Sequence, residues 1–428
     1  MAKNNDDGDL NFNEYRQQFY AAVTKFYREE KAKRKNKLAN FDGEVCISAD
    51  VMEWTRSYCS ISLQFIDENW KLNKWVIYLC SLKEMKGPWD AIVEAMKDWG
   101  IQSKISTLTM ISDYEVGENL EYLINFEQET NKEISPVGAV YCFSDFLTRM
   151  VEYAFREIRD LVYKVRKLWW TKGPEAWHLT SHKLKQAMEL WTAGEFSKAL
   201  ADVPSDEEWK KVESVCQLVD QIHQVAEGLF QKEKITSNLY LYHLYAIRVI
   251  LSEASKGSDS FVGNIAEGML EKLDKYWNRT LLVLAIPTVL DPRFKMKYIE
   301  FVSSQIEGTT ESSQVRTVSD AVRNLYAGYA SGFSQKANAK SELDMYLEEP
   351  LVPRTEDFDV LDWWKSSSSR YPIVSKIARY VLAIPLSLST SSDAYDIEPR
   401  PVEPSLTRLG PKAMNVMACF YSWCEEDK

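Results

Sequence analysis

The spacing of apolar residues changes twice along this chain, and that change limits the folds it can form. Residues 10–40 have the three- to four-residue spacing of an amphipathic helix. Short runs rich in β-branched and aromatic residues follow at 45–49, 58–66 and 75–80, and these predict strands of one sheet. From about residue 140 to 335 the spacing is helical almost throughout. The chain therefore combines a sheet near its start with a long helical region.

The order of the first elements indicates how the sheet is built. Asp67, Glu68 and Asn69 supply a hairpin turn between the second and third strands. Residues 89–99 return to helical spacing and end at Gly100, a residue typical of the position after a helix. A fourth strand follows at 104–111. The order β-β-β-α-β predicts a sheet crossed by a helix, and the fold class is α/β plus α.

The charge of the chain limits the partners it can have. Its 428 residues carry a formal net charge of −11 at pH 7, which disfavours a protein that coats DNA with its whole surface. No apolar run approaches the roughly 18 residues that span a bilayer, so we expect no membrane partner. The seven cysteines are irregularly spaced, which favours reduced thiols in an intracellular protein over disulfides or zinc ligands.

Two local groups of basic residues remain candidates for contact with phosphate. The first is the run 28–37, which is either the solvated end of a helix or a nuclear-import signal or phosphate contact. The second lies on a predicted helix at 156–167, where basic residues share one face and are either solvated or in contact with DNA. The candidates for weak DNA binding are Arg28, Lys33, Arg34, Lys35, Arg159, Arg166 and Lys167.

The most specific motifs follow a polar stretch at 331–340 that predicts a linker. They are FDVLDWWK at 358–365, YP at 371–372 and IARYVLAIP at 377–385. This series resembles the C-terminal dimerisation region of transposases of the hAT (hobo–Activator) superfamily. Upstream, AIPTVLDPRFK at 285–295 and FIDENWKL at 65–72 resemble segments of its host-adopted plant members, the RICESLEEPER-like group. The resemblance covers roughly residues 40 to 424.

The resemblance implies a fold and a domain order. It implies an RNase H-like mixed sheet interrupted by a large all-helical insertion, with C-terminal hAT dimerisation helices. The expected parts are an N-terminal charged helix at 1–40, the first part of the RNase H-like domain at 41–140, the helical insertion at 141–335, and the dimerisation region, which completes the RNase H-like fold, at 336–428. The residues expected at the dimer interface are Trp363, Trp364, Tyr371, Pro372, Ile377 and Leu382. The alternative is that these residues close the chain's own core.

Transposases with an RNase H-like fold cut DNA with three carboxylates that hold two divalent ions. By resemblance, Asp50, just after the strand at 45–49, matches the first carboxylate. Ile111 falls on the second position and Ser392 on the third, so Asp113 and Asp393 are only weak substitutes. We therefore expect no nuclease activity, no metal site and no cofactor. Mg²⁺ or Mn²⁺ is expected only if the chain is an active transposase.

Two further functional motifs of the family are also altered in this sequence. The Cys-x-x-His pair of the family is Cys142 and Asp145 here, and its Thr-Arg-Trp motif is Thr180, Ser181 and His182. The plant members carry an N-terminal BED zinc finger that reads DNA. The segment before the first strand has about 40 residues without cysteine or histidine, so we expect no such finger.

The sequence thus predicts an interaction protein rather than an enzyme. The predicted protein is a catalytically inactive, domesticated hAT transposase derivative of the nucleus. We expect it to form a homodimer, or a dimer with related hAT proteins, to bind nucleic acid weakly, to regulate transcription, and to have no small-molecule substrate. The alternatives are an active DNA transposase with a two-metal site built from Asp50, Asp113 and Asp393, and a truncated relic without a role.

Overall fold

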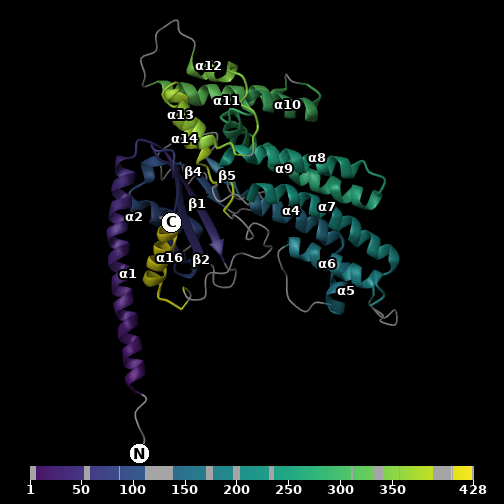
Figure 1. Cartoon of the computed structure of the whole chain (residues 1–428), viewed down its shortest axis with the longest axis horizontal. Helices are drawn as coiled ribbons and strands as arrows, with labels where there is room; N and C mark the ends of the chain where they lie inside the picture. The colour runs from purple at the N-terminus through teal and green to yellow at the C-terminus, as the bar shows by residue number, and fades with distance from the viewer. Residues whose placement is uncertain are drawn as a thin grey trace, which may run out of the picture.

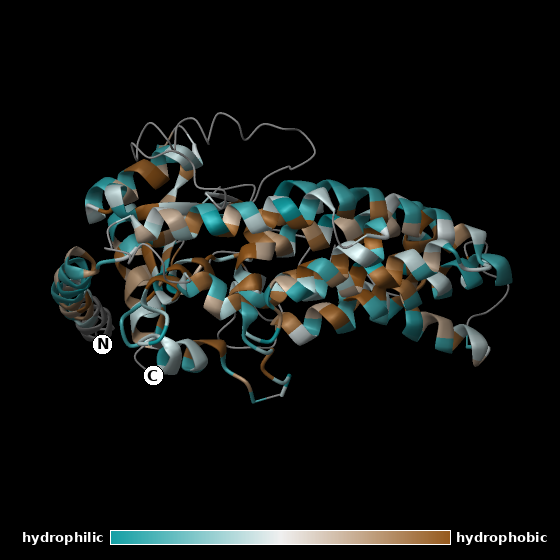
Figure 2. Ribbon diagram, turned by 90° about the horizontal axis from the view of Figure 1, so that it is seen from above, coloured by the Kyte–Doolittle hydropathy of each residue, from teal (hydrophilic) through white to brown (hydrophobic). Residues whose placement is uncertain are grey.

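The fold consists of one mixed sheet, helices on both of its faces, and a helical body beside it (Figure 1). The computed structural model describes residues 6–52, 58–85, 87–110, 138–169, 177–195, 203–230, 236–309, 312–331, 341–355, 357–388, 406 and 408–426. The two main hydrophobic clusters lie on opposite faces of the sheet, and Figure 2 shows hydrophilic residues on the outer faces of the helices.

The sheet has the strand order β3-β2-β1-β4-β5. Its strands are β1 (Val45–Met52), β2 (Tyr58–Ile66), β3 (Leu72–Ser81), β4 (Ile105–Met110) and β5 (Ala139–Tyr141). β1, β2 and β3 pair antiparallel, whereas β4 pairs parallel with both β1 and β5. The helix α2 (Pro88–Trp99) connects β3 to β4, which confirms the predicted order β-β-β-α-β. The strand β5 was not predicted, because three residues are too few for a readable pattern.

The hairpin turn and the helix end that the sequence predicts both form in the structure. The carboxylate of Asp67 accepts hydrogen bonds from the backbone N–H of Asn69 at 3.0 Å and of Lys71 at 3.1 Å, which fixes the hairpin turn. Gly100 has a φ of 65° and follows α2 in the left-handed conformation that glycine adopts without strain. Both turns therefore form where the sequence predicts them.

The helical part begins after β5 and confirms the predicted α/β plus α class. Its first helices, packed beside the sheet, are α4 (Phe143–Glu157), α5 (Arg159–Trp169), α6 (Trp177–Thr192), α7 (Asp206–Phe230), α8 (Tyr240–Ser255) and α9 (Ser260–Val289). The later helices are α10 (Lys295–Glu307), α11 (Ser313–Ala330), α12 (Glu342–Glu348), α13 (Val360–Ser367), α14 (Pro372–Leu382) and α16 (Pro411–Glu426). Short 3₁₀ turns lie at Leu82–Glu84, Gln102–Lys104 and Ser237–Leu239.

The two faces of the sheet are covered by different parts of the chain. Successive residues of β1 point to opposite faces of the sheet. Ile47 packs in the cluster with α1 (Asp6–Asn40), α2 and α16, whereas Cys46 packs in the cluster of the helical body. On the second face, Gln64 Nε2 donates a hydrogen bond to the carbonyl of Ala383 at 2.9 Å. Residues from both ends of the chain thus complete the layers around one sheet, as Figure 1 shows for α1 and α16.

The expectations about membrane-spanning segments and about the cysteines can be compared with the described residues. None of the described helices is long and apolar enough to cross a membrane. All seven cysteines are free thiols, and only Cys424 is more than slightly exposed. Burial raises the pKa of Cys80 to about 11, so this thiol stays protonated near neutral pH.

Candidate functional site

The first candidate site is the edge of the sheet at which the parallel strands β1, β4 and β5 end. Asp50 lies inside β1, because this strand runs on to Met52, and not after the strand as the sequence suggested. Asp50 pairs with Ser60 of β2 and is half-buried. Ala49 pairs with Met110, the last residue of β4. The end of β4 therefore lies next to the part of β1 that carries Asp50.

A segment from the C-terminal part of the chain reaches the same edge. The backbone N–H of Cys142 donates to the carbonyl of Met110 at 3.3 Å, which places Cys142 just beyond β5. The N–H of Leu388 donates to the sulfur of Cys142 at 3.3 Å, and Ser387 Oγ donates to Ser144 Oγ at 2.9 Å. Ser387 and Leu388 therefore lie beside the edge that β1 and β4 form.

The remaining members of the expected carboxylate set lie outside the described residues. These are Ile111, Asp113, Ser392 and Asp393. Within the described ranges, no three histidine, cysteine, aspartate or glutamate side chains come together as ligands for a metal ion. Two divalent ions need several shared carboxylates. Among the described residues, this edge offers only Asp50 at a position that matches the family.

The other family motifs form hydrogen bonds that stabilise helices. Burial raises the pKa of Cys142, whose thiol lies 3.1 Å from Ser144 Oγ. Asp145 forms an ion pair with Arg149 one turn later in α4, at 3.0 Å. On α6, Ser181 donates to Asp220 of α7 at 2.8 Å, and Thr180 is buried beside it. His182 is exposed, and its Nε2 lies 2.9 Å from Gln186.

The residues predicted at the dimer interface are mostly buried within this chain. Trp364 and Tyr371 are fully buried, and Ile377 and Leu382 are nearly so. Trp363 is half-buried, and only Pro372 is exposed. Burial of these side chains favours the alternative that they close the chain's own core, because the rings of Trp364 and Tyr371 pack with Tyr346 between α12, α13 and α14.

Trp364 and Tyr346 anchor this C-terminal region to the end of α9. Trp364 Nε1 donates a hydrogen bond to the carbonyl of Leu290 at 2.8 Å, and the hydroxyl of Tyr346 donates to the carbonyl of Val289 at 3.0 Å. The ring of Trp364 also stacks on Trp70 of the β2–β3 hairpin, with a centroid distance of 6.4 Å. This aromatic cluster joins three segments that are far apart in the sequence.

The basic run at 28–37 packs α1 against the sheet rather than facing solvent as a whole. Arg34 is 8% exposed, and its guanidinium carbon lies 4.7 Å from the ring centre of Trp75 and 5.2 Å from that of Trp423. Lys35 pairs with Asp98 of α2. Both residues were predicted to contact DNA, and that prediction is wrong for Arg34, because cation–π contacts hold its charge inside the fold.

The remaining basic candidates stay on the surface. Lys33 is exposed and pairs with Glu30 one turn away at 2.6 Å, and Arg28 is exposed on the same helix. On α5, the side chain of Arg159 is 79% exposed, Lys167 is exposed, and Arg166 is half-buried. Exposed cations therefore remain on both α1 and α5.

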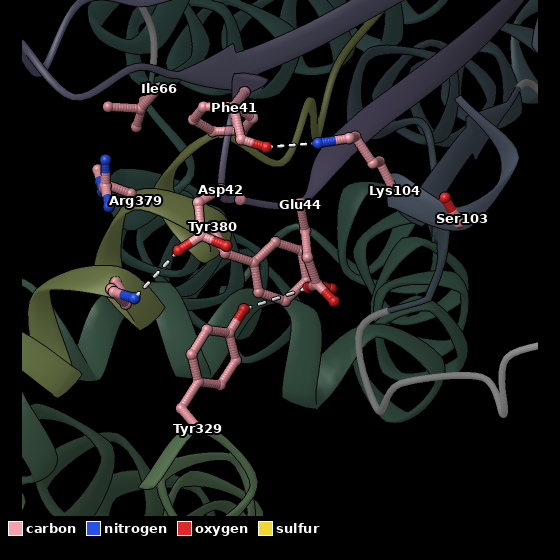
Figure 3. A pocket seen from close by; sticks show the side chains of 11 residues that line it. Phe41, Asp42, Glu44, Ile66, Ser103, Lys104, Tyr329, Arg379 and Tyr380 are labelled. Atoms are coloured by element: carbon pink, nitrogen blue, oxygen red, sulfur yellow. Dashed lines mark hydrogen bonds and ion pairs between the residues drawn. The ribbon is translucent and has the colours of Figure 1, made fainter. Parts of the chain in front are cut away.

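A hollow of about 390 Å³ lies at the opposite edge of the sheet, where β1 begins (Figure 3). There the hydroxyl of Tyr329 donates to Glu44 at 3.2 Å, and Lys376 donates to Asp42 at 3.4 Å. Lys104 donates to a backbone carbonyl of the α1–β1 junction. Glu44 and Asp50 are six residues apart on an extended chain, which corresponds to about 20 Å. This polar hollow is thus separate from the Asp50 edge, and its contacts fix the junction of α1 and β1 to α11 and α14.

Several structurally important side chains were not found from the sequence. Trp70 lies in the hairpin motif but was not predicted to stack on Trp364. Tyr346 lies in the helix before the tryptophan pair and is fully buried. The positive charge of Arg34 suggested a surface position, although two aromatic side chains distant in sequence cover it. Only the local density of aromatic residues signalled such a cluster.

Comparison with protein families assigns three parts of the chain. The family model described as hAT-like transposase, RNase-H fold, matches residues 238–329, which form α8 to α11 in this structure. The hAT family C-terminal dimerisation region matches residues 342–424, and the ZBED1 RNase-like domain matches residues 52–128.

Similar full-length proteins come from plants. The zinc finger BED domain-containing protein DAYSLEEPER of Arabidopsis thaliana is 28% identical over 94% of this chain and 66% of its own length. The zinc finger BED domain-containing protein RICESLEEPER 1 of Oryza sativa subsp. japonica is 27% identical over 93% of this chain and 67% of its own. A putative AC transposase of Zea mays is 23% identical over 94% of this chain. The chain spans about two thirds of the length of the first two relatives.

Proposed function

Because the chain belongs to the hAT superfamily of transposases and transposase-derived proteins, we propose that it is a non-catalytic, domesticated member that works as a dimer on DNA in the nucleus. The observation that carries this proposal is the edge around Asp50. By the resemblance, Asp50 matches the first carboxylate position of the family, while Ile111 and Ser392 fall on the other two. A two-metal reaction needs all three carboxylates, so the role left to the fold is binding.

The proposed dimer is supported by the match of residues 342–424 to the hAT dimerisation region. Trp364 and Tyr371 are buried within the protomer, so they stabilise the fold of this region instead of contacting the second copy. The surface that meets the second copy is then formed by exposed residues of the region. Met345, 40% exposed on α12, is one of them.

The proposed contact with DNA rests on exposed cations and is weak. Arg159 and Lys167 lie on α5, and Arg28 and Lys33 lie on α1. Contacts of lysine and arginine with phosphate release counterions, so affinity falls steeply as salt increases and depends little on DNA sequence. Regulation of transcription is the role that such a dimer would serve, through occupancy of DNA rather than its cleavage.

Light scattering and a DNA titration test this function together. The proposal predicts a mass of about twice 49.5 kDa at micromolar concentration. It also predicts duplex binding that weakens by an order of magnitude or more between about 0.05 and 0.2 M salt. The double variant Arg159→Glu and Lys167→Glu should abolish binding if α5 makes the contact, with Arg28→Glu and Lys33→Glu as the matched pair on α1. A monomeric mass, or tight sequence-selective binding at the higher salt, would contradict the proposal.

The second candidate function is an active transposase that uses Asp50 with Asp113 and Asp393. One observation favours it: Met110 and Leu388, the last described residues before those two positions, lie at or beside the edge that carries Asp50. A plasmid-nicking assay with Mg²⁺ or Mn²⁺ separates the two functions. Nicking that disappears in the Asp50→Asn variant would establish the transposase and remove the non-catalytic role.

A further inference from the structure

An exposed apolar groove is lined by residues of α8 and α10 and of the segment that connects α12 to α13. Figure 1 shows the positions of these helices. Its volume is about 630 Å³, within the range typical of ligand-binding pockets. Four of the ten large apolar side chains exposed in the described part of the chain line it: Tyr242, Val249, Phe301 and Leu351. Contiguous exposed apolar surface of this kind marks a contact site more often than a solvated face.

The floor of the groove is made of packed aromatic rings. The ring centre of Phe294 lies 5.0 Å from that of Tyr298 and 5.9 Å from that of Tyr242. The rings of Tyr245 and Phe301 meet edge to face at 6.0 Å. Because the rings support one another, the groove is formed before any partner arrives, which lowers the entropy cost of binding.

The rim of the groove is cationic, although the chain as a whole carries a charge of −11. Lys297 and Arg354 are exposed, and neither has a carboxylate partner among the described residues. The guanidinium carbon of Arg354 lies 4.5 Å from the ring centre of Phe294. By contrast, the neighbouring Arg293 pairs with buried Asp291 at 2.6 Å. Lys297 and Arg354 therefore give the described part of the groove a local positive potential.

A buried hydroxyl in the same groove has no hydrogen-bond partner among the described residues. Tyr298 is 6% exposed, and its hydroxyl oxygen meets no donor or acceptor within the described structure. A buried polar group left in this state destabilises the folded protein. An acceptor supplied by a bound partner would remove that destabilisation. The hydroxyl thus points to an occupant that carries carboxylate or carbonyl oxygens as well as apolar groups.

We propose that this groove binds an acidic amphipathic peptide segment of a partner protein. Its apolar side chains would lie on the aromatic floor, and a carboxylate beside them would meet Arg354 and Lys297. An oxygen of the segment would accept the hydrogen bond of Tyr298. Nucleic acid fits less well, because its phosphates need a row of cations and this groove is mainly apolar. The inference does not depend on dimerisation or on DNA binding.

The test is selection from a library of random displayed peptides on the full chain, followed by affinity measurements on the enriched peptides. The expected peptides combine aspartate or glutamate with leucine or aromatic residues. Phe301→Ser and Arg354→Glu should each weaken their binding by about tenfold or more. Tyr298→Phe should weaken it about fivefold, the effect of one hydrogen bond. Phe301 and Arg354 are exposed, so their variants should keep the wild-type melting temperature.

Leu179→Ser is the matched control, because Leu179 is 42% exposed on α6, away from the groove. This variant should bind the selected peptides as tightly as the wild type. Three results would overturn the proposal. They are enriched peptides without acidic residues, binding that survives both Phe301→Ser and Arg354→Glu, and a selection that enriches nothing. Two further results would assign the groove to another occupant and equally contradict the proposal: single-stranded DNA binding, or a dimer mass, lost in these same two variants.

Discussion

Replacing Trp364 by phenylalanine tests whether Trp364 belongs to the core of one protomer or to the dimer interface. The side chain is fully buried, and its Nε1 donates to the carbonyl of Leu290 at 2.8 Å. Phenylalanine cannot donate this bond, and a buried carbonyl left without a donor costs about 1–3 kcal/mol. The smaller ring also leaves a cavity among Trp70, Tyr346 and Tyr371, which adds to the loss. We expect the free energy of unfolding to fall by about 2–4 kcal/mol.

Urea unfolding at two protein concentrations, about tenfold apart, measures this loss. Trp363→Phe is the matched control, because Trp363 is half-buried and its Nε1 has no acceptor among the described residues. The control should cost about 1 kcal/mol or less. If Trp364 lies in the core of one protomer, the loss is the same at both concentrations and the mass of the protein is unchanged. A loss that grows on dilution, with a shift toward monomer, would refute this reasoning, because only an interface couples stability to concentration in this way.

Further predictions follow from α1 and the β2–β3 hairpin. Arg34→Gln should lower the free energy of unfolding by about 2 kcal/mol, because it removes a desolvated cation from two indole rings; Lys33→Gln, on the exposed side, should change it by less than about 0.5 kcal/mol in the same urea titration. Burial alone would raise the pKa of Asp67, but hydrogen bonds from Lys37, the Lys71 N–H and Asn73 together lower it. A carboxyl with a lowered folded-state pKa stabilises the fold above the unfolded value near pH 4, and that stability is lost as pH falls through the folded value. Thermal melts between pH 7 and 3 should therefore show a smaller acid-induced loss for Asp67→Asn than for the wild type; an equal loss would contradict the assigned role.

The sequence predicted the elements whose signals are local. The strands β1 to β4, the turn at Asp67 and the helix end at Gly100 depend on neighbouring residues, and all are confirmed. The class α/β plus α is confirmed as well, because it depends only on the order of those elements. The domain boundaries, including those of the helical insertion, stay predictions.

Features that depend on distant contacts could not be predicted in this way. Arg34 reads as a surface charge until the fold brings Trp75 and Trp423 over it from β3 and α16. Trp364 reads as an exposed anchor until α9 supplies an acceptor for its Nε1. The groove around Phe301 has no local signature, since Arg354 and Tyr242 come from separate segments. The pattern of residue types along the chain predicts which side chains are buried, but not which distant segments cover them.

Calorimetric titration of the protein with Mn²⁺ tests the non-catalytic role most directly. Among the described residues at this edge of the sheet, Asp50 is the carboxylate that matches the family by resemblance, and a single carboxylate does not hold a pair of divalent ions. We expect no binding in the micromolar range, and the same weak heats for the wild type and for Asp50→Asn. Micromolar binding of Mn²⁺ that disappears in Asp50→Asn would contradict the account, because it would show that the chain retains a metal site of the transposase kind.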